Sequence, residues 1–293
     1  MTGNPEPRCV WDARALLGEG PVWDPDEGVL NWVDIKGKAL HRYRPADGWR
    51  ASLSVPSEIG CIALRQGGGL VAALRTGFVF IGLPAGAVIP LSDPEAHLPG
   101  NRFNDGKCDR NGRFFAGTMD DACQAPTGSL YRLDPGGETT RLISGYAVCN
   151  GPAWSPDGGT LYFSDSAARL IHAFDFDVAG GSLANGRVFA RVPEDAGYPD
   201  GLTVDAEGFL WSAHWDGWRL TRYAPDGCID RVIPLPVRRP TSCAFGGPGL
   251  DRLYVTSASI DLTPDELAGN PLAGGLFELD AGVAGLPEPR FAG

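Results

Sequence analysis

A pattern of short strands joined by tight turns recurs along nearly the whole chain. In residues 20–34 an apolar stretch, a Pro-Asp-Glu-Gly turn and a second apolar stretch follow one another, and residues 38–43 add a third segment of alternating character. Residues 151–175 and 201–223 repeat this order. Pro, Asp and Gly each favour a reversal of the chain for a separate physical reason. The repeat therefore limits the fold to one built of equivalent, strand-rich units.

Weaker copies of the same unit fill the intervals between the clear ones. The six copies are spaced by 40 to 50 residues when they are aligned on Trp23, Ala63, Cys108, Trp154, Val204 and Phe245. Units of this length with three or four strands are typical of β-propeller blades. The alternative is a β-sandwich with chance similarity among its hairpins, but a sandwich is not expected to keep this spacing. We predict an all-β, six-bladed β-propeller that forms a single domain over residues 1–293.

The two ends of the chain indicate how such a ring closes. Residues 9–16 precede the first full unit and resemble an additional outer strand, and the last unit ends near residues 276–279, where it has room for one. We therefore predict that the N-terminal strand joins the last blade. The high content of Gly (41) and Pro (25) agrees with many short strands and few long helices.

Composition excludes several classes of partner. Hydrophobic content of 43% and charged content of 21% are those of a globular protein, and the net charge of -11 argues against nucleic acid and anionic membranes. Residues 1–5 show no basic region followed by an apolar core, so no signal peptide is expected. Seven cysteines without CxxC spacing indicate a reduced, cytoplasmic protein. We expect it to be a monomer with no membrane partner.

Three segments place an oxygen-donor side chain next to glycine, directly before the first strand of a unit. The donors are Glu19, Asn150 and Asp200, and Asn104 has the same position in the third unit. In a propeller the first strand of each blade lines the central channel, so equivalent positions in different blades face one opening. We predict that these side chains converge there.

The chemistry of these side chains predicts a metal ion. A set of oxygen donors without His or Cys suits Ca²⁺, Mg²⁺ or Mn²⁺. Zn²⁺ and Fe²⁺ stay open, because carboxylates are acceptable ligands for zinc as well. The opposing interpretation is that the Asn-Gly and Pro-Asp-Gly sequences are only turns. Three donors at matched repeat positions favour the metal site.

Five motifs resemble the SMP-30/gluconolactonase family, the regucalcin-like lactonases. They occur in the family's order between Leu17 and Leu276, at residues 18–21, 102–107, 115–119, 150–152 and 199–201. The resemblance implies a six-bladed propeller that binds one divalent ion in its central opening and hydrolyses sugar lactones.

Carried over residue by residue, the resemblance makes Glu19, Asn150 and Asp200 the metal ligands, with Asp200 also the general base. It makes Arg102 and Asn104 substrate contacts. Some members place a Glu shortly after the Thr-Met pair to contact sugar hydroxyls, whereas this chain has Asp120 and Asp121 there. We expect Asp120 or Asp121 to substitute for that Glu, or the contact to be absent.

The expected reaction is hydrolysis of a sugar lactone, such as gluconolactone or xylonolactone, to the aldonic acid. Lactone hydrolysis passes through a tetrahedral oxyanion, and a divalent ion can stabilise that charge and lower the pKa of water. The alternatives are a related propeller acting on organophosphates or other esters, and a non-enzymatic calcium-binding propeller. Neither a phosphate-binding glycine motif nor a Gly-x-Ser-x-Gly nucleophile motif occurs.

Other residues receive less specific expectations. His214 is expected low in the central channel, with a structural hydrogen-bonding role favoured, and Trp215 is expected to pack between blades. The loops of residues 120–127 and 193–198 are expected near the opening, either covering substrate or as plain surface, with Tyr198 as a possible wall of the site.

Overall fold

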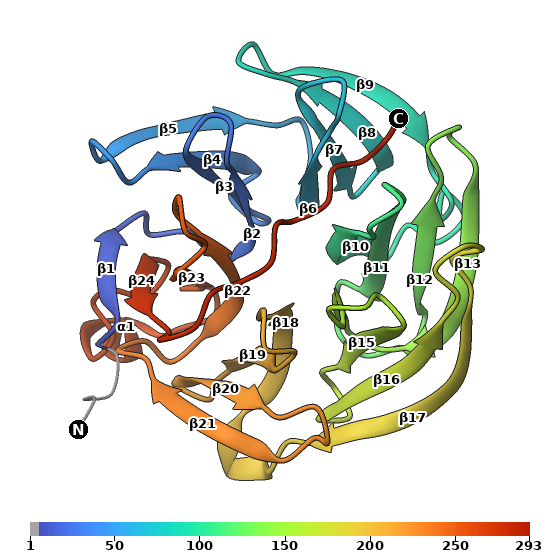
Figure 1. Ribbon diagram of the computed structural model, residues 1–293. Coiled ribbons are helices and arrows are strands. Elements are labelled where there is room, and N and C mark those ends of the chain that lie inside the picture. The colour runs from blue at the N-terminus through green and yellow to red at the C-terminus, as the bar shows by residue number, and fades with distance from the viewer. Residues whose placement is uncertain (1–5) are drawn as a thin grey trace.

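Six four-stranded antiparallel sheets surround a central axis (Figure 1). The computed structural model describes residues 6–293, so the expectation about a signal peptide, made on residues 1–5, lies outside the described part. Strand pairing within each sheet follows chain order in five of the six, which gives each blade an inner strand at the axis and an outer strand at the rim. The prediction of an all-β, six-bladed propeller is confirmed.

The first three blades take up the N-terminal half of the chain. Blade 1 comprises β2 (Gly18–Asp24), β3 (Val29–Asp34), β4 (Ala39–Arg44) and β5 (Trp49–Ser54). Blade 2 comprises β6 (Ile59–Leu64), β7 (Leu70–Leu74), β8 (Gly77–Gly82) and β9 (Ala87–Ser92). Blade 3 comprises β10 (Asn101–Cys108), β11 (Phe114–Asp120), β12 (Gly128–Leu133) and β13 (Thr139–Tyr146).

The last three blades follow, with two short helical segments in their loops. Blade 4 comprises β14 (Cys149–Trp154), β15 (Thr160–Asp165), β16 (Leu170–Phe176) and β17 (Leu183–Arg191). Blade 5 comprises β18 (Tyr198–Val204), β19 (Leu210–Trp215), β20 (Arg219–Tyr223) and β21 (Ile229–Pro234). Blade 6 comprises β22 (Pro240–Gly246), β23 (Arg252–Ser257), β24 (Leu276–Asp280) and β1 (Arg8–Trp11). The helical segments are η1 (Glu194–Ala196) and α1 (Pro264–Ala268). None of the helices within residues 6–293 has the length and apolar character needed to cross a membrane.

The hydrophobic core is divided among the contacts between neighbouring blades. Inner strands such as β2, β6 and β10 are buried along their whole length, because both of their faces pack against neighbouring sheets and only an edge borders the channel. Six clusters of buried apolar side chains result, and each joins side chains of two adjacent blades. Outer strands such as β5 expose alternate residues, as expected for strands with one face in water. Each blade is therefore stabilised by both of its neighbours.

The ring closes in blade 6, which contains strands from both ends of the chain. The N-terminal strand β1 pairs antiparallel with β24, with Cys9 opposite Phe277. It is shorter than the predicted residues 9–16, because the chain leaves the sheet after Trp11 to enter blade 1. Trp11 also meets Trp32 of blade 1 edge to face, with ring centroids 5.5 Å apart. The closing strand thus contributes to the contact between blades 6 and 1.

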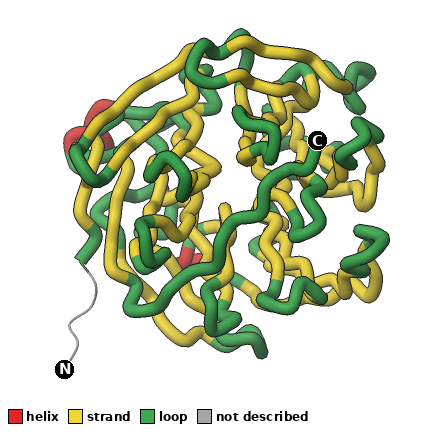
Figure 2. Tube along the Cα trace, turned by 45° about the horizontal axis from the view of Figure 1, so that its top comes forward, coloured by secondary structure: helices red, strands yellow, loops and turns green. Residues whose placement is uncertain are grey.

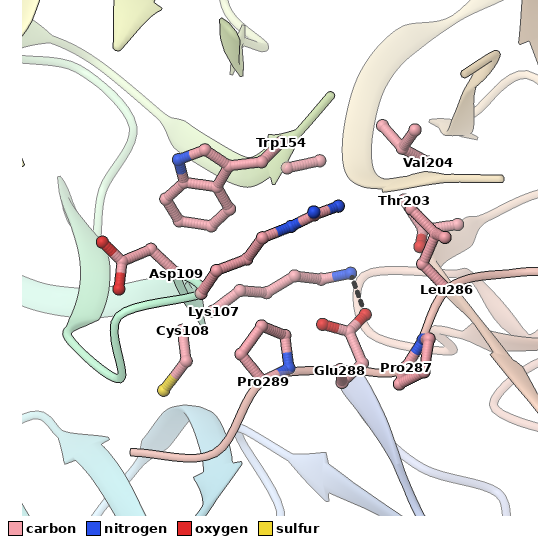
Figure 3. Close-up of a pocket in the computed structure, with 12 residues that line it drawn as sticks. Lys107, Cys108, Asp109, Trp154, Thr203, Val204, Leu286, Pro287, Glu288 and Pro289 are labelled. Carbon is pink, nitrogen blue, oxygen red and sulfur yellow. Dashed lines mark hydrogen bonds and ion pairs between the residues drawn. The ribbon is translucent and has the colours of Figure 1, made fainter. Parts of the chain in front are cut away.

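The C-terminal segment, residues 281–293, crosses one end of the ring (Figures 1 and 2). Gly285 bridges to Asp205 of blade 5, and Phe291 bridges to Arg65 of blade 2. Figure 3 shows the middle of this segment beneath blades 3 and 4, where Glu288 accepts a hydrogen bond from Lys107 at 3.0 Å. A cavity of about 50 Å³ remains between the segment and the strand ends. The segment has no counterpart in the repeat, and the sequence did not predict it.

We expect Phe291→Ala to destabilise the protein by roughly 3–5 kcal/mol, because the ring is 1% exposed within the core between blades 2 and 3. Urea unfolding followed by tryptophan fluorescence measures the free energy of unfolding. The control is Ile229→Ala, at a side chain that is 55% exposed, which should change it by less than about 0.5 kcal/mol. Equal stability of both variants would show that the C-terminal segment does not anchor the ring.

Candidate active site

A cavity of about 530 Å³ opens at the end of the channel opposite the C-terminal segment. This volume lies within the range of small-molecule binding sites. Its wall includes all four oxygen donors that the repeat predicted, together with Arg102. The lining residues are Leu17, Glu19, Arg102, Asn104, Met119, Cys123, Val148, Asn150, Ser166, Ala167, Tyr198, Asp200, Trp215, Arg239 and Asp261. The predicted convergence of Glu19, Asn104, Asn150 and Asp200 is therefore observed.

Irregular pairing at the start of each inner strand turns these donors toward the cavity. The register between inner and second strand shifts directly after Glu19, after Asn150 and after Pro199. Such bulges re-aim a side chain out of the regular ladder. The following glycines Gly20 and Gly151 have φ of 51° and 76°, in the left-handed region that favours glycine. An oxygen donor followed by glycine in the sequence thus indicates a bulge at that point of the strand.

A chain of hydrogen bonds fixes the amides at the site. Arg102 Nη1 donates to Asn104 Oδ1 at 2.7 Å, and Asn104 Nδ2 donates to Asn150 Oδ1 at 2.7 Å. Asn150 Nδ2 donates to Ser166 Oγ at 2.9 Å, and that hydroxyl donates to the Pro199 carbonyl at 2.6 Å. Because each amide nitrogen has an acceptor, the amide orientations are determined by the network. The chain connects blades 3, 4 and 5 across the mouth of the channel.

Three buried carboxyl groups lie close together at this end of the channel. Glu19, Asp105 and Asp200 are 3%, 2% and 5% exposed. Burial raises the pKa of Glu19 and of Asp200 well above the ordinary values. Repulsion by Asp200 and Asp105 raises the pKa of Glu19 further, and repulsion by Asp105 raises that of Asp200. Burial also raises the pKa of Asp105 to about 6.

No lysine or arginine within residues 6–293 forms an ion pair with these three groups. The cations whose charge acts on them have other partners: Arg102 pairs with Asp121 at 2.7 Å, and Lys107 pairs with Glu288 at 3.0 Å. Buried carboxylates in proteins are normally paired with a cation or bound to a metal ion. The site therefore has a deficit of positive charge.

The donors fit a divalent cation in chemistry and in placement. Glu19, Asn150 and Asp200 offer two carboxylates and an amide oxygen from three blades to one cavity, a combination suited to hard ions. Asp105 is a poorer candidate, because its two oxygens accept hydrogen bonds from the Gly106 and Gly151 backbone nitrogens. Within the described chain, no group of three or more His, Cys, Asp or Glu side chains is arranged to hold a metal, so the amide of Asn150 is needed to complete the set.

Asp121 contacts Arg102 rather than the cavity. Its carboxylate accepts hydrogen bonds from Arg102 Nε at 2.7 Å, Lys36 Nζ at 2.6 Å and Arg75 Nη1 at 3.0 Å. Although partial burial opposes the effect, these three donors hold the pKa of Asp121 well below its usual range. Glu58 binds Lys36 and Arg75 from the other side. The network fixes the guanidinium of Arg102 at the cavity wall.

Asp120 has a local role in its loop. Its carboxylate accepts hydrogen bonds from the backbone nitrogens of Ala122, Gln124 and Ala125 at 3.3, 3.0 and 2.9 Å. Neither Asp120 nor Asp121 lines the cavity. A direct contact between either carboxylate and the sugar stays a prediction, and the structure gives both groups protein partners.

His214 lies in the second strand of blade 5, opposite Pro199, and not low in the channel as expected. Its Nδ1 lies 2.8 Å from the Ala196 carbonyl, so the expected structural hydrogen bond is confirmed. Burial lowers its pKa to about 4, which keeps the imidazole neutral. Both expected loops reach the cavity, one through Cys123 and the other through Tyr198.

Trp215 and Arg239 are among the lining residues for which no role in the site was predicted. Trp215 was expected only to pack between blades, and it borders the core of blades 1 and 2 but also lines the cavity. Arg239 precedes Pro240 at the entrance to the sixth inner strand. Extending the repeat alignment to that entrance would have placed Arg239 at the mouth.

Six blades around a central cavity that contains carboxylates define the class of the protein as a β-propeller with a central site. The crystal structure of a calcium-binding protein, regucalcin from Agrobacterium tumefaciens, matches with a TM-score of 0.94 and 31% identity over 98% of this chain and 97% of that one. Residues 17–259 match the family model described as the SMP-30/Gluconolactonase/LRE-like region. The chain belongs to this family.

Curated relatives are similar over almost their full lengths. The L-arabinolactonase of Azospirillum brasilense is 40% identical over 96% of this chain and 94% of the relative. The 6-deoxy-6-sulfogluconolactonase of Pseudomonas putida is 39% identical over 98% of both chains.

In metal-free protein, we expect Asp200→Asn to become more stable relative to the wild type as pH rises from about 4. The raised pKa means that folded Asp200 binds its proton more tightly than the unfolded chain does. The protonated Asp200 carboxyl therefore contributes fully to stability when the pH is below the pKa of Asp in the unfolded chain. This contribution is lost as the pH rises through the folded-state pKa, whereas Asn does not titrate. Urea unfolding in chelator across this range measures the difference.

The control for this experiment is Asp120→Asn. Hydrogen bonds from the Ala125 and Gln124 backbone lower the pKa of Asp120, so that variant should become more stable relative to the wild type as pH falls below about 4 and should show little pH dependence above it. The same sign for both variants would contradict the charge deficit assigned to the buried site.

Proposed function

We propose that this protein is a metal-dependent lactonase that hydrolyses a sugar lactone to the aldonic acid. The observation that carries the proposal is the pair of buried carboxylates Glu19 and Asp200 beside Asn150, on the wall of a cavity of about 530 Å³, with no ion-pair partner for either carboxylate within residues 6–293. The two curated relatives named as sugar lactonases support the same reaction.

Glu19, Asn150 and Asp200 are the proposed metal ligands. A divalent ion held by them supplies polarisation of the lactone carbonyl and a lower pKa for water. Ser166 Oγ accepts a hydrogen bond from the Asn150 amide nitrogen at 2.9 Å, which restrains the amide whose oxygen would bind the ion. Glu19 Oε2 accepts a hydrogen bond from the Gly20 nitrogen at 3.0 Å, which restrains its carboxylate at the bulge.

Asp200 is the proposed general base that takes a proton from the attacking water. Its carboxylate lies at the cavity wall and has no ion-pair partner within residues 6–293. Burial and repulsion by Asp105 raise its pKa, although the charge of Arg102 acts in the opposite direction. The 5% exposure of the residue excludes bulk water from the carboxylate, which favours proton transfer to the group over hydration of it.

Arg102 and Asn104 are the proposed substrate contacts. The Nε and Nη1 atoms of Arg102 are occupied by protein acceptors, and its position is determined by Asp121. A guanidinium fixed in this way can orient the hydroxyls of a lactone ring with little loss of side-chain entropy. We assign Asp121 to substrate binding through Arg102 and Asp120 to the shape of the adjoining loop.

The proposal also covers the identity of the metal ion and the cellular location of the protein. The oxygen donors suit Ca²⁺, Mg²⁺ and Mn²⁺, with Zn²⁺ and Fe²⁺ as further candidates, and a similar solved structure is described as a calcium-binding protein. We propose a cytoplasmic monomer that acts in carbohydrate metabolism. The seven free cysteines agree with a reducing compartment.

We expect the protein to release protons from aldonolactones at a rate that falls to the spontaneous rate when a chelator is added. Asp200→Asn should abolish turnover even if some metal binding remains, because the variant lacks the general base. A pH-indicator assay with gluconolactone, xylonolactone and arabinonolactone measures initial rates, and single metal ions added to stripped protein identify the ion. Hydrolysis of organophosphates or simple esters alone would favour a related propeller hydrolase, and metal binding without turnover of any ester would favour a calcium-binding propeller.

We expect the aldonate product to protect Cys123 from alkylation, because this exposed thiol lines the cavity. Cys228 is also exposed but lies outside the cavity, so its labelling should not change and serves as an internal control. Peptide mass spectrometry after brief iodoacetamide treatment at alkaline pH measures both sites. Equal protection of both thiols, or of neither, would contradict product binding in this cavity.

A further inference from the structure

A second guanidinium lines the cavity on the side opposite Arg102. Arg102 belongs to blade 3, and Arg239 stands at the entrance to the inner strand of blade 6, three blades away around the ring. Arg239 is 8% exposed, so the cavity wall is the place where it meets solvent. The role proposed above for Arg102 leaves Arg239 without an assigned task.

Arg239 is held rigidly by protein contacts on three sides. Its Nε donates to Asp216 Oδ1 at 2.7 Å, and its Nη1 donates to the Ile260 carbonyl. The guanidinium lies over the ring of Trp215, 4.6 Å from the centroid. Its Nη2 has no hydrogen-bond partner in the part of the chain that the structure describes. A buried donor group with two atoms fixed and one unused is ready to bind an acceptor from the cavity.

The charge of Arg239 is only partly balanced. The same Oδ1 atom of Asp216 lies 2.8 Å from Arg238 Nε in a second ion pair, so one carboxylate pairs with two guanidinium groups. Glu266 provides a further negative charge, but it contacts Arg238, whose side chain is 31% exposed and absent from the cavity wall. Asp261, an exposed carboxylate that also lines the cavity, forms no ion pair with Arg239 in the part of the chain that the structure describes.

The cavity is larger than a single lactone ring requires. A six-carbon aldonolactone has about 12 non-hydrogen atoms, and even at the roughly 30 Å³ that each water occupies in the liquid they would fill about 360 Å³. The cavity measures about 530 Å³. A ring bound beside Glu19 and Asp200 thus leaves room for a substituent that extends toward blade 6.

We propose that Arg239, supported by Trp215, is a specificity residue that binds an oxygen acceptor on the exocyclic carbon of the lactone ring, remote from the carbonyl. The acceptor is the hydroxyl of a hydroxymethyl group or an anionic oxygen in its place, since a guanidinium binds both. This inference rests on the proposed lactonase function. It assigns substrates with such a substituent a higher kcat/KM than otherwise identical lactones without it.

Three lactones test the proposal: glucono-1,5-lactone, its 6-phosphate, and xylono-1,5-lactone, which has the same ring but lacks the exocyclic carbon. The readout is the ratio of kcat/KM for each substituted lactone to that for xylono-1,5-lactone. In Arg239→Met this ratio should fall about tenfold for at least one substituted lactone, as expected for loss of a hydrogen bond from a charged donor. A larger fall for the phosphate identifies an anionic substituent, and a larger fall for gluconolactone identifies the hydroxyl.

The matched control is Arg238→Met, which removes the other guanidinium from Asp216 without touching the cavity. Met at position 239 can still pack on Trp215, and Asp216 keeps Arg238 as a partner, so both variants are expected to fold, as thermal unfolding will show. A ratio that is the same in wild type and Arg239→Met for both substituted lactones would overturn the inference, whatever the absolute rates. An equal fall in Arg238→Met would overturn it too, because it would assign the effect to Asp216. A wild-type protein that hydrolyses none of the three lactones would overturn the proposed function itself.

Discussion

The pairing of β1 with β24 is the contact on which the rest of the structure depends. The site consists of side chains from blades 1, 3, 4, 5 and 6, and they meet only because the sheets form a closed ring. Each interblade core needs both of its blades, so an unclosed ring would expose the core between blades 6 and 1, which contains Trp23, Trp32 and Tyr254. Because β1 comes from the opposite chain terminus, its pairing with β24 couples the folding of blade 6 to that of blade 1.

The closed ring also makes the buried carboxylates possible. Placing Glu19, Asp105 and Asp200 together out of water opposes folding, because each carboxylate loses hydration and repels the others. The bulges that present Glu19 and Asp200 to the cavity interrupt the regular ladders of two inner strands as well. Six interblade cores hold these unfavourable features in place. Local conflict of this kind is concentrated at functional sites, where the surrounding fold compensates for it.

Most of the fold and the donor set could be predicted from the sequence because both follow the repeat. A glycine beside Glu19 or Asn150 marks a bulge at the same point of successive units, so equivalence in sequence becomes proximity in space. The Asp121 network and the C-terminal segment were not predictable in this way. Asp121 meets Lys36 and Arg75 from two other blades, and Phe291 fills a core far from its neighbours in sequence. Such contacts occur at one place in the ring only, so the repeat in the sequence cannot predict them.

The two ends of the channel are chemically different, and only one of them has a cavity large enough for a small molecule. At one end the strands begin with bulges and polar side chains around a cavity of about 530 Å³. At the other end the C-terminal segment lies across the channel, Lys107 is paired with Glu288, and about 50 Å³ remains. Substrate and product must therefore use the same mouth. In the proposed reaction, an aldonate formed beside Glu19 and Asp200 is repelled by these carboxylates and attracted by Arg102 and Arg239 on opposite walls, whereas the neutral lactone experiences neither force.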